Sequence, residues 1–142
     1  MDTSSVYLQR VLGSGCVAQA EVLRMDGTVR TSTGRLLTTV QEGRRLVRLF
    51  EAPADTIAAG ITVGGCTYVA AQADRRLLHG KRGSAGVVVV RNPPFIVVAL
   101  YEEGHRPADA VLAVGNLADL LASRAGGPDS PPGDPAGPQA GL

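Results

Sequence analysis

The sequence predicts an α+β fold in which one mainly antiparallel sheet carries helices on its faces. Three observations lead to this class. Amphipathic segments stand near both ends of the chain, at about residues 4–12 and 107–124. Between residues 60 and 101 the chain consists of short runs rich in Val and Ile, separated by turn residues. These turns are too short for the crossovers that parallel strands need, so neighbouring runs are expected to pair antiparallel.

Composition excludes several broad classes of protein. The chain has 142 residues, of which 44% are hydrophobic, and its 14 basic and 13 acidic side chains leave a net charge of +1. This length fits one domain, and the hydrophobic content argues against a disordered chain. A general nucleic-acid-binding protein would be clearly basic. The longest apolar run, residues 95–101, is far shorter than the roughly 20 residues of a membrane-spanning helix.

The start of the chain and the two cysteines indicate the compartment. Residues 1–5 are polar and acidic, and they lack the apolar stretch of a secretory signal. Cys16 and Cys66 are too far apart in the sequence for a metal-binding pair and give no disulfide framework, so we expect them to be small core residues. We therefore expect a reduced, cytoplasmic protein without a metal or another cofactor.

The N-terminal part of the chain is expected to form a helix followed by a hairpin. Over residues 4–12, apolar side chains recur four positions apart, which gives a short helix one apolar face. Two extended runs follow at residues 16–25 and 28–33. Asp26-Gly27 separates them, and this dipeptide is typical of tight hairpin turns because both turn residues need positive φ.

A second helix is expected over residues 40–51. Thr39 and Glu42 have the spacing of a capping box, in which each side chain accepts a hydrogen bond from the backbone of the other residue. Pro53 is expected to end the helix, because the residue before a proline disfavours helical geometry. The side of this helix nearer to solvent is basic and carries Arg44, Arg45 and Arg48.

Five short strands and a final helix complete the predicted fold. A glycine-rich stretch at residues 80–85 is interpreted as a hairpin loop, since it lacks the residue order of a phosphate-binding loop. The final helix covers residues 107–124, begins with a proline suited to its first turn and has one apolar face. The two terminal helices are expected to pack together on one face of the sheet. The expected strands are residues 60–63, 66–72, 77–78, 86–91 and 95–101.

Residues 126–142 differ in composition from the rest of the chain. They contain five Gly and five Pro and show no periodic apolar pattern. Such a segment buries too little apolar surface to offset the entropy lost on ordering. We therefore predict a folded domain within residues 1–125 and a disordered tail over residues 126–142.

No arrangement of catalytic residues is apparent. His79 and His105 have no nearby nucleophile in a recognisable motif, and we expect both at the surface. Glu102 and Glu103 are adjacent, so in an extended chain they point to opposite sides and cannot converge on one bond. The sequence predicts a binding protein and not an enzyme.

Several stretches, taken together in their order and spacing, resemble the profilin family. The resemblance covers about residues 4–124 and indicates a divergent member, with some likeness to the fourth profilin of vertebrates. It implies a small cytoplasmic, cytoskeletal protein that is monomeric, binds actin monomers, proline-rich ligands and acidic phosphoinositides, and regulates actin polymerisation. The stretches that carry it are residues 26–29, 60–69, 80–87, 95–103 and 117–121.

The resemblance implies a proline-binding site whose aromatic residues are largely missing. In the family this site is an aromatic cluster formed by the two terminal helices and a neighbouring strand. Only Tyr7 matches one of the aromatics, and the chain has no Trp. Loss of an aromatic anchor typically costs about 2 kcal/mol of binding energy or more. We expect polyproline binding to be weak or lost. The corresponding positions are Ser4, Tyr7, Arg30 and Leu120.

The resemblance also implies an actin-binding surface on the middle strands and the start of the last helix. At two positions the family residue is replaced: a Gly by Ala108 and an Asn by Val111. An interface group that the missing Asn leaves unpaired would cost about 1–3 kcal/mol, so we expect weaker actin binding than is usual in the family. The expected contact residues are Arg76, Lys81, Arg82, Arg91, Ala108 and Val111.

A basic surface for acidic lipids is a further expectation. Residues 74–91 contain five basic residues and one acidic residue, and each basic side chain near an anionic membrane contributes about 1 kcal/mol. The alternative is that these charges are solvated and have no single partner. The expected lipid-binding residues are Arg44, Arg45, Arg75, Lys81 and Arg82.

Two alternatives stay open. The first is an atypical profilin that binds acidic phosphoinositides and has little affinity for actin. The second is a roadblock- or longin-like module, which also combines an antiparallel sheet with flanking helices and acts as a dimer or scaffold subunit. The assembly state separates an actin-binding profilin from the scaffold module, because a monomer that co-elutes with actin favours the profilin and a stable symmetric dimer favours the scaffold.

Overall fold

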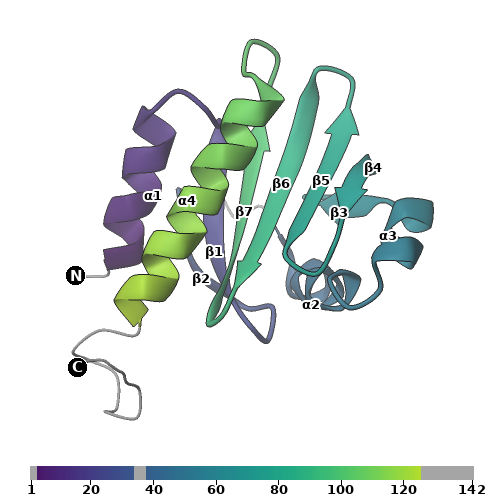
Figure 1. The fold of residues 1–142 in the computed structure, drawn as a ribbon, viewed down its shortest axis with the longest axis horizontal. Helices are drawn as coiled ribbons and strands as arrows, with labels where there is room; N and C mark the ends of the chain where they lie inside the picture. Colours follow the sequence, from purple (N-terminus) through teal and green to yellow (C-terminus); the bar gives the residue numbers. More distant parts are fainter. Residues whose placement is uncertain (1–2, 34–37, 126–142) are drawn as a thin grey trace.

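The computed structural model describes residues 3–33 and 38–125, without the side chains of Thr3 and Ser4. Figure 1 shows the arrangement of the helices and strands in this part of the chain. In chain order they are α1 (Thr3–Gly13), β1 (Gln19–Arg24), β2 (Val29–Ser32), α2 (Val40–Leu49), α3 (Pro53–Ala59), β3 (Ile61–Val63), β4 (Cys66–Ala73), β5 (Leu77–Arg82), β6 (Ala85–Asn92), β7 (Phe95–Tyr101) and α4 (Pro107–Ala125).

The strands form one seven-stranded sheet in the order β2-β1-β7-β6-β5-β4-β3. Each neighbouring pair is antiparallel, which confirms the predicted sheet. The pairing of β6 with β7 runs from Gly86 opposite Tyr101 to Asn92 opposite Phe95. The short connections expected between these runs are therefore hairpin turns.

Helices cover both faces of the sheet. α1 and α4 lie side by side on one face (Figure 1), as predicted for the terminal helices. On this side, Val88 and Val90 of β6 belong to the core under α1 and α4. On the opposite side, Val87 and Val89 pack with Leu46 of α2. Successive strand residues point to opposite faces, and both faces are covered, so this stretch of β6 is apolar without alternation.

The start of α2 is fixed by the predicted capping box. The Thr39 hydroxyl accepts from the backbone N–H of Glu42, and the Glu42 carboxylate accepts from the backbone N–H of Thr39, both at 3.1 Å. The same carboxylate accepts from the backbone N–H groups of Gly64 and Gly65, each at 2.9 Å. One side chain therefore joins the start of α2 to the β3–β4 turn.

A short helix that is not apparent from the sequence follows α2. Pro53 stands after the end of α2, as expected, but it also begins α3, where the fixed φ of proline suits the first turn. Thr56 is the buried residue of α3, and its hydroxyl donates to the carbonyl oxygen of Leu49 at 2.9 Å. The helix lacks an apolar stripe, so the pattern that reveals amphipathic helices is missing from its sequence.

β5 is longer than predicted, and the turn after it is shorter. The expected strand ends at Leu78 and is followed by a loop from Gly80, whereas β5 continues to Arg82. Gly80 pairs with Val87, and a Cβ at Gly80 would lie 2.7 Å from the Cβ of Tyr68. This glycine therefore serves close packing inside the sheet, not a loop conformation.

The described residues carry no sign of a membrane span or a metal centre. Within residues 3–33 and 38–125, no helix is both long and apolar enough to cross a bilayer, and no three His, Cys, Asp or Glu side chains group together as metal ligands. Cys16 and Cys66 are half-buried and pack against the two core clusters, in line with the predicted core role.

Candidate functional site

Exposed side chains lie on the α4 side of β4 and β5, beyond the strands that α4 covers. α4 lies over β6 and β7 (Figure 1). A row of opposed residues crosses the sheet: Val69 faces Lys81, Lys81 faces Gly86, and Gly86 faces Tyr101. Directly opposed residues share one face, and Tyr101 belongs to the core under α4. Val69, which is 74% exposed, and Lys81 therefore point to the α4 side.

The side of α4 that faces β5 and β6 is fixed by Asp119. Its Oδ1 accepts from Arg76 at 2.7 Å and from Asn92 at 2.8 Å. Ala108 and Leu112 share this side, because residues at i, i+4 and i+11 lie on one face of a helix. Leu112 is 65% exposed. We call the following four residues the open sheet face: Val69, Lys81, Ala108 and Leu112.

A buried histidine–tyrosine pair lies beneath the open sheet face. The Tyr101 ring crosses Gly86, where a Cβ would lie 2.2 Å from it, and its hydroxyl is 2.7 Å from Nε2 of His79. His79 is 8% exposed, so the expectation of a surface histidine is wrong. Burial lowers the pKa of His79, and the charge of Lys81 acts in the same direction. Burial also raises the pKa of Tyr101.

The turn between β7 and α4 carries the adjacent glutamates in contact with solvent. Glu102 and Glu103 are both exposed. The backbone N–H of Glu102 donates to Nδ1 of His105 at 2.9 Å, and His105 is half-buried. The side chain of His105 thus stabilises the turn by accepting this hydrogen bond.

The predicted actin contacts separate onto the two faces of the sheet. Arg82 follows Lys81 in β5 and points to the opposite face, where its Nη1 lies 2.8 Å from Sγ of Cys66. Val111 packs partly into the core under α4. The members of the predicted set that lie on the α4 side are Arg76, Lys81, Ala108 and Val111.

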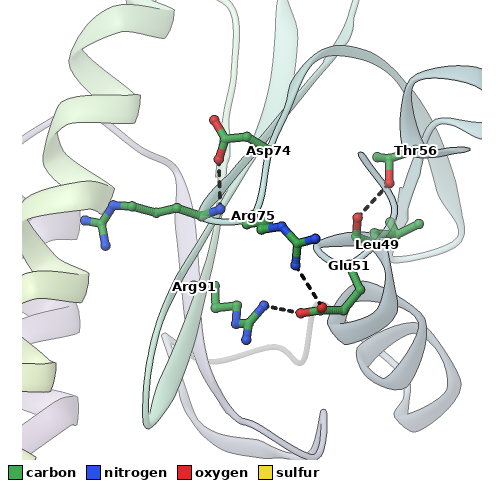
Figure 2. A network of polar contacts seen from close by, with 7 residues as sticks. Leu49, Glu51, Thr56, Asp74, Arg75 and Arg91 are labelled. Atoms are coloured by element: carbon green, nitrogen blue, oxygen red, sulfur yellow. Dashed lines mark hydrogen bonds and ion pairs between the residues drawn. The ribbon is translucent and has the colours of Figure 1, made fainter. Parts of the chain in front are cut away.

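Arg91 and Arg75 both bind Glu51, just beyond the end of α2 (Figure 2). Nη1 of Arg75 is 3.2 Å from Oε1 of Glu51, and Arg91 forms an ion pair with Oε2. Arg91 lies opposite Ile96, which belongs to the core under α2, so it points away from the open sheet face. These arginines join the end of α2 to the sheet.

Arginines of α2 line a hollow that also reaches Thr62 of β3. The hollow has a volume of about 460 Å³, and its walls include Arg44, Arg45, Arg48 and Thr62. We call it the α2 hollow. The predicted lipid-binding residues are gathered here only in part, because Arg75 pairs with Glu51 and the two basic residues at the end of β5 point to opposite faces.

An apolar groove of about 250 Å³ lies between α1 and α4. We call it the terminal-helix groove. Tyr7 and Val11 of α1 line it together with Ala113, Leu117 and Leu120 of α4. The predicted proline-binding positions at Tyr7 and Leu120 therefore meet in one place.

The other two predicted proline-binding positions do not line this groove in the described structure. Arg30 lies on β2, and its guanidinium group is 5.3 Å from the centroid of the Phe95 ring. The side chain of Ser4 lies outside the described residues.

Two arginines cover Tyr7, which is 8% exposed. The guanidinium group of Arg10 lies 5.4 Å from the Tyr7 ring centroid. Nε of Arg124 donates a hydrogen bond to the Tyr7 hydroxyl at 3.0 Å. Neither arginine is among the predicted site residues. Tyr7 and Arg10 have the i, i+3 spacing of helix neighbours, whereas Arg124 is a partner that only the packing of α1 on α4 reveals.

The fold and these surfaces define a binding protein, and comparison with known proteins identifies its family. The sequence model of the profilin family matches residues 3–125. Profilin-P of Physarum polycephalum is 34% identical over 113 residues, which cover 80% of this chain and 90% of that protein. Profilin-1A of Acanthamoeba castellanii is 35% identical over 111 residues, with 78% and 88% covered. The chain therefore belongs to the profilin family.

Solved structures agree with this assignment. Profilin II of Acanthamoeba castellanii superposes with a TM-score of 0.81 at 29% identity, and 86% of this chain and 98% of that chain are covered. The same fold, at 16% and 15% identity, occurs in LokiProfilin2 in complex with rabbit actin (TM-score 0.73) and in mouse profilin IIa in complex with a double repeat from the FH1 domain of mDia1 (TM-score 0.70). Profilins are non-enzymatic actin-binding proteins, and the roadblock- or longin-like alternative for the fold is not supported.

Proposed function

We propose that the chain binds actin monomers through the open sheet face and thereby regulates actin polymerisation in the cytoplasm. Family membership supports this, as does the actin complex of LokiProfilin2, which shares the fold. The observation that carries the proposal is the exposure of two large apolar side chains, Val69 at 74% and Leu112 at 65%, on the side of the sheet where α4 begins. Protein interfaces combine an apolar centre with a polar rim, and Lys81 supplies a basic rim residue.

Two replacements make this interaction weaker than is usual in the family. Ala108 and Val111 stand where profilins carry Gly and Asn, and Val111 offers no hydrogen bond. An interface group left unpaired by this change weakens binding about fivefold to 150-fold.

The test replaces the apolar residues of the open sheet face with a charged one. Val69→Glu and Leu112→Glu are each expected to raise the Kd for actin monomers about tenfold or more, as burial of a charge in an interface centre does. The readout is the slowing of pyrene-actin polymerisation by excess protein. Ile57→Glu on α3 is the matched control, because Ile57 is apolar and 51% exposed. Equal effects of all three variants, or a wild-type chain that does not slow polymerisation, would contradict the proposal.

We also infer that neutral proline-rich ligands bind weakly. Polyproline recognition needs rigid aromatic faces for stacking. Among the described residues that line the terminal-helix groove, Tyr7 is the aromatic one. Arg10 lies over its ring, and Arg124 binds its hydroxyl. A proline decamer is expected to bind at least about tenfold more weakly than it binds mouse profilin IIa in parallel. Similar affinities for the two proteins would overturn this inference.

The α2 hollow favours acidic phospholipids as a second ligand. Arg44, Arg45 and Arg48 line it, and none of them forms an ion pair with another described residue. Each arginine near an anionic surface contributes about 1 kcal/mol. Co-sedimentation with vesicles is expected to increase with their phosphoinositide content and to fall in Arg44→Glu/Arg45→Glu. Arg106→Glu, at an exposed arginine before α4, is the control, and an equal loss in the control would contradict a specific surface.

A further inference from the structure

The terminal-helix groove combines an apolar floor with a basic end. Arg10 and Arg124 both contact Tyr7, so their guanidinium groups lie at the Tyr7 end of the groove. In residues 3–33 and 38–125 no carboxylate forms an ion pair with either arginine. Arg10 also lies over the ring on which a proline would stack, and Arg124 holds the hydroxyl of that ring. An occupant of this groove therefore has to be apolar along its length and has to carry acidic groups that draw the arginines away from Tyr7.

The chain carries a segment of this chemistry directly after α4. Residues 126–142 contain five Pro and no Lys or Arg, and their acidic residues are Asp129 and Asp134. α4 ends at Ala125, one residue after Arg124, and Figure 1 shows this end beside the start of α1. The segment thus begins at the basic end of the groove.

The segment is long enough to fill the groove. From Leu120 back to Ala113, α4 rises about 10 Å at 1.5 Å per residue. A proline-rich strand covers that distance with about four residues at 3.1 Å each. Gly126 and Gly127 precede the first proline and permit a reversal of chain direction without a steric penalty.

We propose that residues 128–135 of this chain dock in its own terminal-helix groove as an acidic proline-rich strand. The prolines lie over Val11, Leu117 and Leu120. Asp129, the aspartate nearer to α4 in the sequence, pairs with Arg10 and Arg124 at the Tyr7 end, which uncovers the Tyr7 ring for stacking. The tether supplies an effective concentration on the order of millimolar, so contacts that are too weak to hold a separate peptide are sufficient. A proline-rich partner then has to displace this segment and needs acidic residues of its own.

The test compares amide spectra of the full-length protein, labelled with ¹⁵N, and its Asp129→Asn/Asp134→Asn variant. Both aspartates lie outside the domain that the family model matches, so the domain is expected to fold in both forms. Loss of two exposed ion pairs lowers the docking equilibrium constant about twofold to thirtyfold. The amide signals of Val11, Ala113 and Asn116 are therefore expected to shift, while those of α2 stay in place. About 1 M salt is expected to move the wild-type spectrum toward that of the variant.

A double-mutant comparison separates docking from a general charge effect. Arg10→Gln is expected to reproduce the shifts of the aspartate variant, and the combination of both changes is expected to add little further. Arg45→Gln, on α2, is the matched control and leaves the groove signals unchanged. Shifts confined to residues 126–142 and the last turn of α4, or full additivity with Arg10→Gln, would overturn the proposal. Shifts that grow with protein concentration would overturn it too, because they would place the segment in the groove of a second copy.

Discussion

Gly43 lies where α2 touches the β1–β2 turn, and its missing side chain sets the distance between them. A Cβ at this position would lie 2.0 Å from the carbonyl oxygen of Gly27. Because that oxygen belongs to the backbone, it cannot rotate away, and the helix itself must shift. Gly43→Ala is therefore expected to lower the free energy of unfolding by about 1–3 kcal/mol. Urea unfolding followed by circular dichroism measures this change.

Gly115 provides the matched control because it is also a helical glycine. A Cβ at Gly115 would have no neighbour within 4 Å. Alanine favours the helical state over glycine by about 0.5–1 kcal/mol, so Gly115→Ala is expected to stabilise the protein. If both substitutions changed stability in the same direction, close packing at Gly43 would not be the cause.

His79 makes stability depend on pH. Its folded-state pKa is lowered from the ordinary value of 6.5 by burial, so the unfolded chain binds a proton at this site more readily than the folded chain. The associated stability is fully present above pH 6.5 and is lost as the pH falls from there through the folded-state pKa. The free energy of unfolding is expected to fall more steeply with decreasing pH in the wild type than in His79→Gln. Equal slopes in urea unfolding between about pH 7 and pH 5 would refute this role.

At the scale of elements, Glu42 couples α2 to the β3–β4 hairpin. Its carboxylate accepts from three backbone N–H groups, those of Thr39, Gly64 and Gly65. In Glu42→Gln an amide group replaces one of the acceptor oxygens and leaves a turn N–H without its partner. The expected loss is about 1–3 kcal/mol of unfolding free energy, together with faster hydrogen exchange at Gly64 and Gly65.

Glu51 is the control for this prediction, because it is also a carboxylate at α2 and its recorded partners are side chains. Its side chain is 53% exposed, and exposed ion pairs contribute about 0–1 kcal/mol. Glu51→Gln is expected to cost less than Glu42→Gln and to leave exchange at the turn unchanged. The reverse order would show that the turn is held by other contacts.

The elements that the sequence predicts correctly are those with a periodic apolar pattern. The terminal helices and the strands rich in Val carry such patterns, and the capping box of α2 is visible in the spacing of Thr39 and Glu42. α3 has no apolar stripe, and Gly80 resembles a loop residue although it is required by Tyr68. These features depend on contacts between distant segments, which local periodicity does not contain.

For the candidate surfaces, the sequence indicates which residue types take part but not which of them lie on the same face. Lys81 and Arg82 are neighbours in the sequence, but strand alternation sends them to opposite faces. Arg91 is predicted among the actin contacts, whereas its ion pair with Glu51 holds it on the side of α2. The exposure of Leu112 depends on where α4 lies on the sheet. The hydrogen bond to the Tyr7 hydroxyl comes from Arg124, which is more than a hundred positions away in the sequence.

At the scale of the whole molecule, α4 separates two surfaces. Ala108 and Leu112 share the side of α4 that faces β5 and β6, whereas Ala113, Leu117 and Leu120 face the terminal-helix groove. A ligand in the groove and a partner on the open sheet face therefore contact different sides of one helix. Occupation of one surface does not sterically block the other, so the docking proposed for residues 128–135 leaves the open sheet face accessible to actin.

The edges of the sheet bear on the assembly state. β2 has four residues and β3 has three, and such short edge strands offer few free backbone groups to a second copy. The protein is therefore expected to be a monomer, with a mass in sedimentation equilibrium near 14.6 kDa over a wide range of concentrations. A stable dimer would contradict this expectation. If Val69→Glu also dissociated that dimer, the open sheet face would be a contact between copies. Both the monomeric state and the assignment of this face to actin would then be wrong.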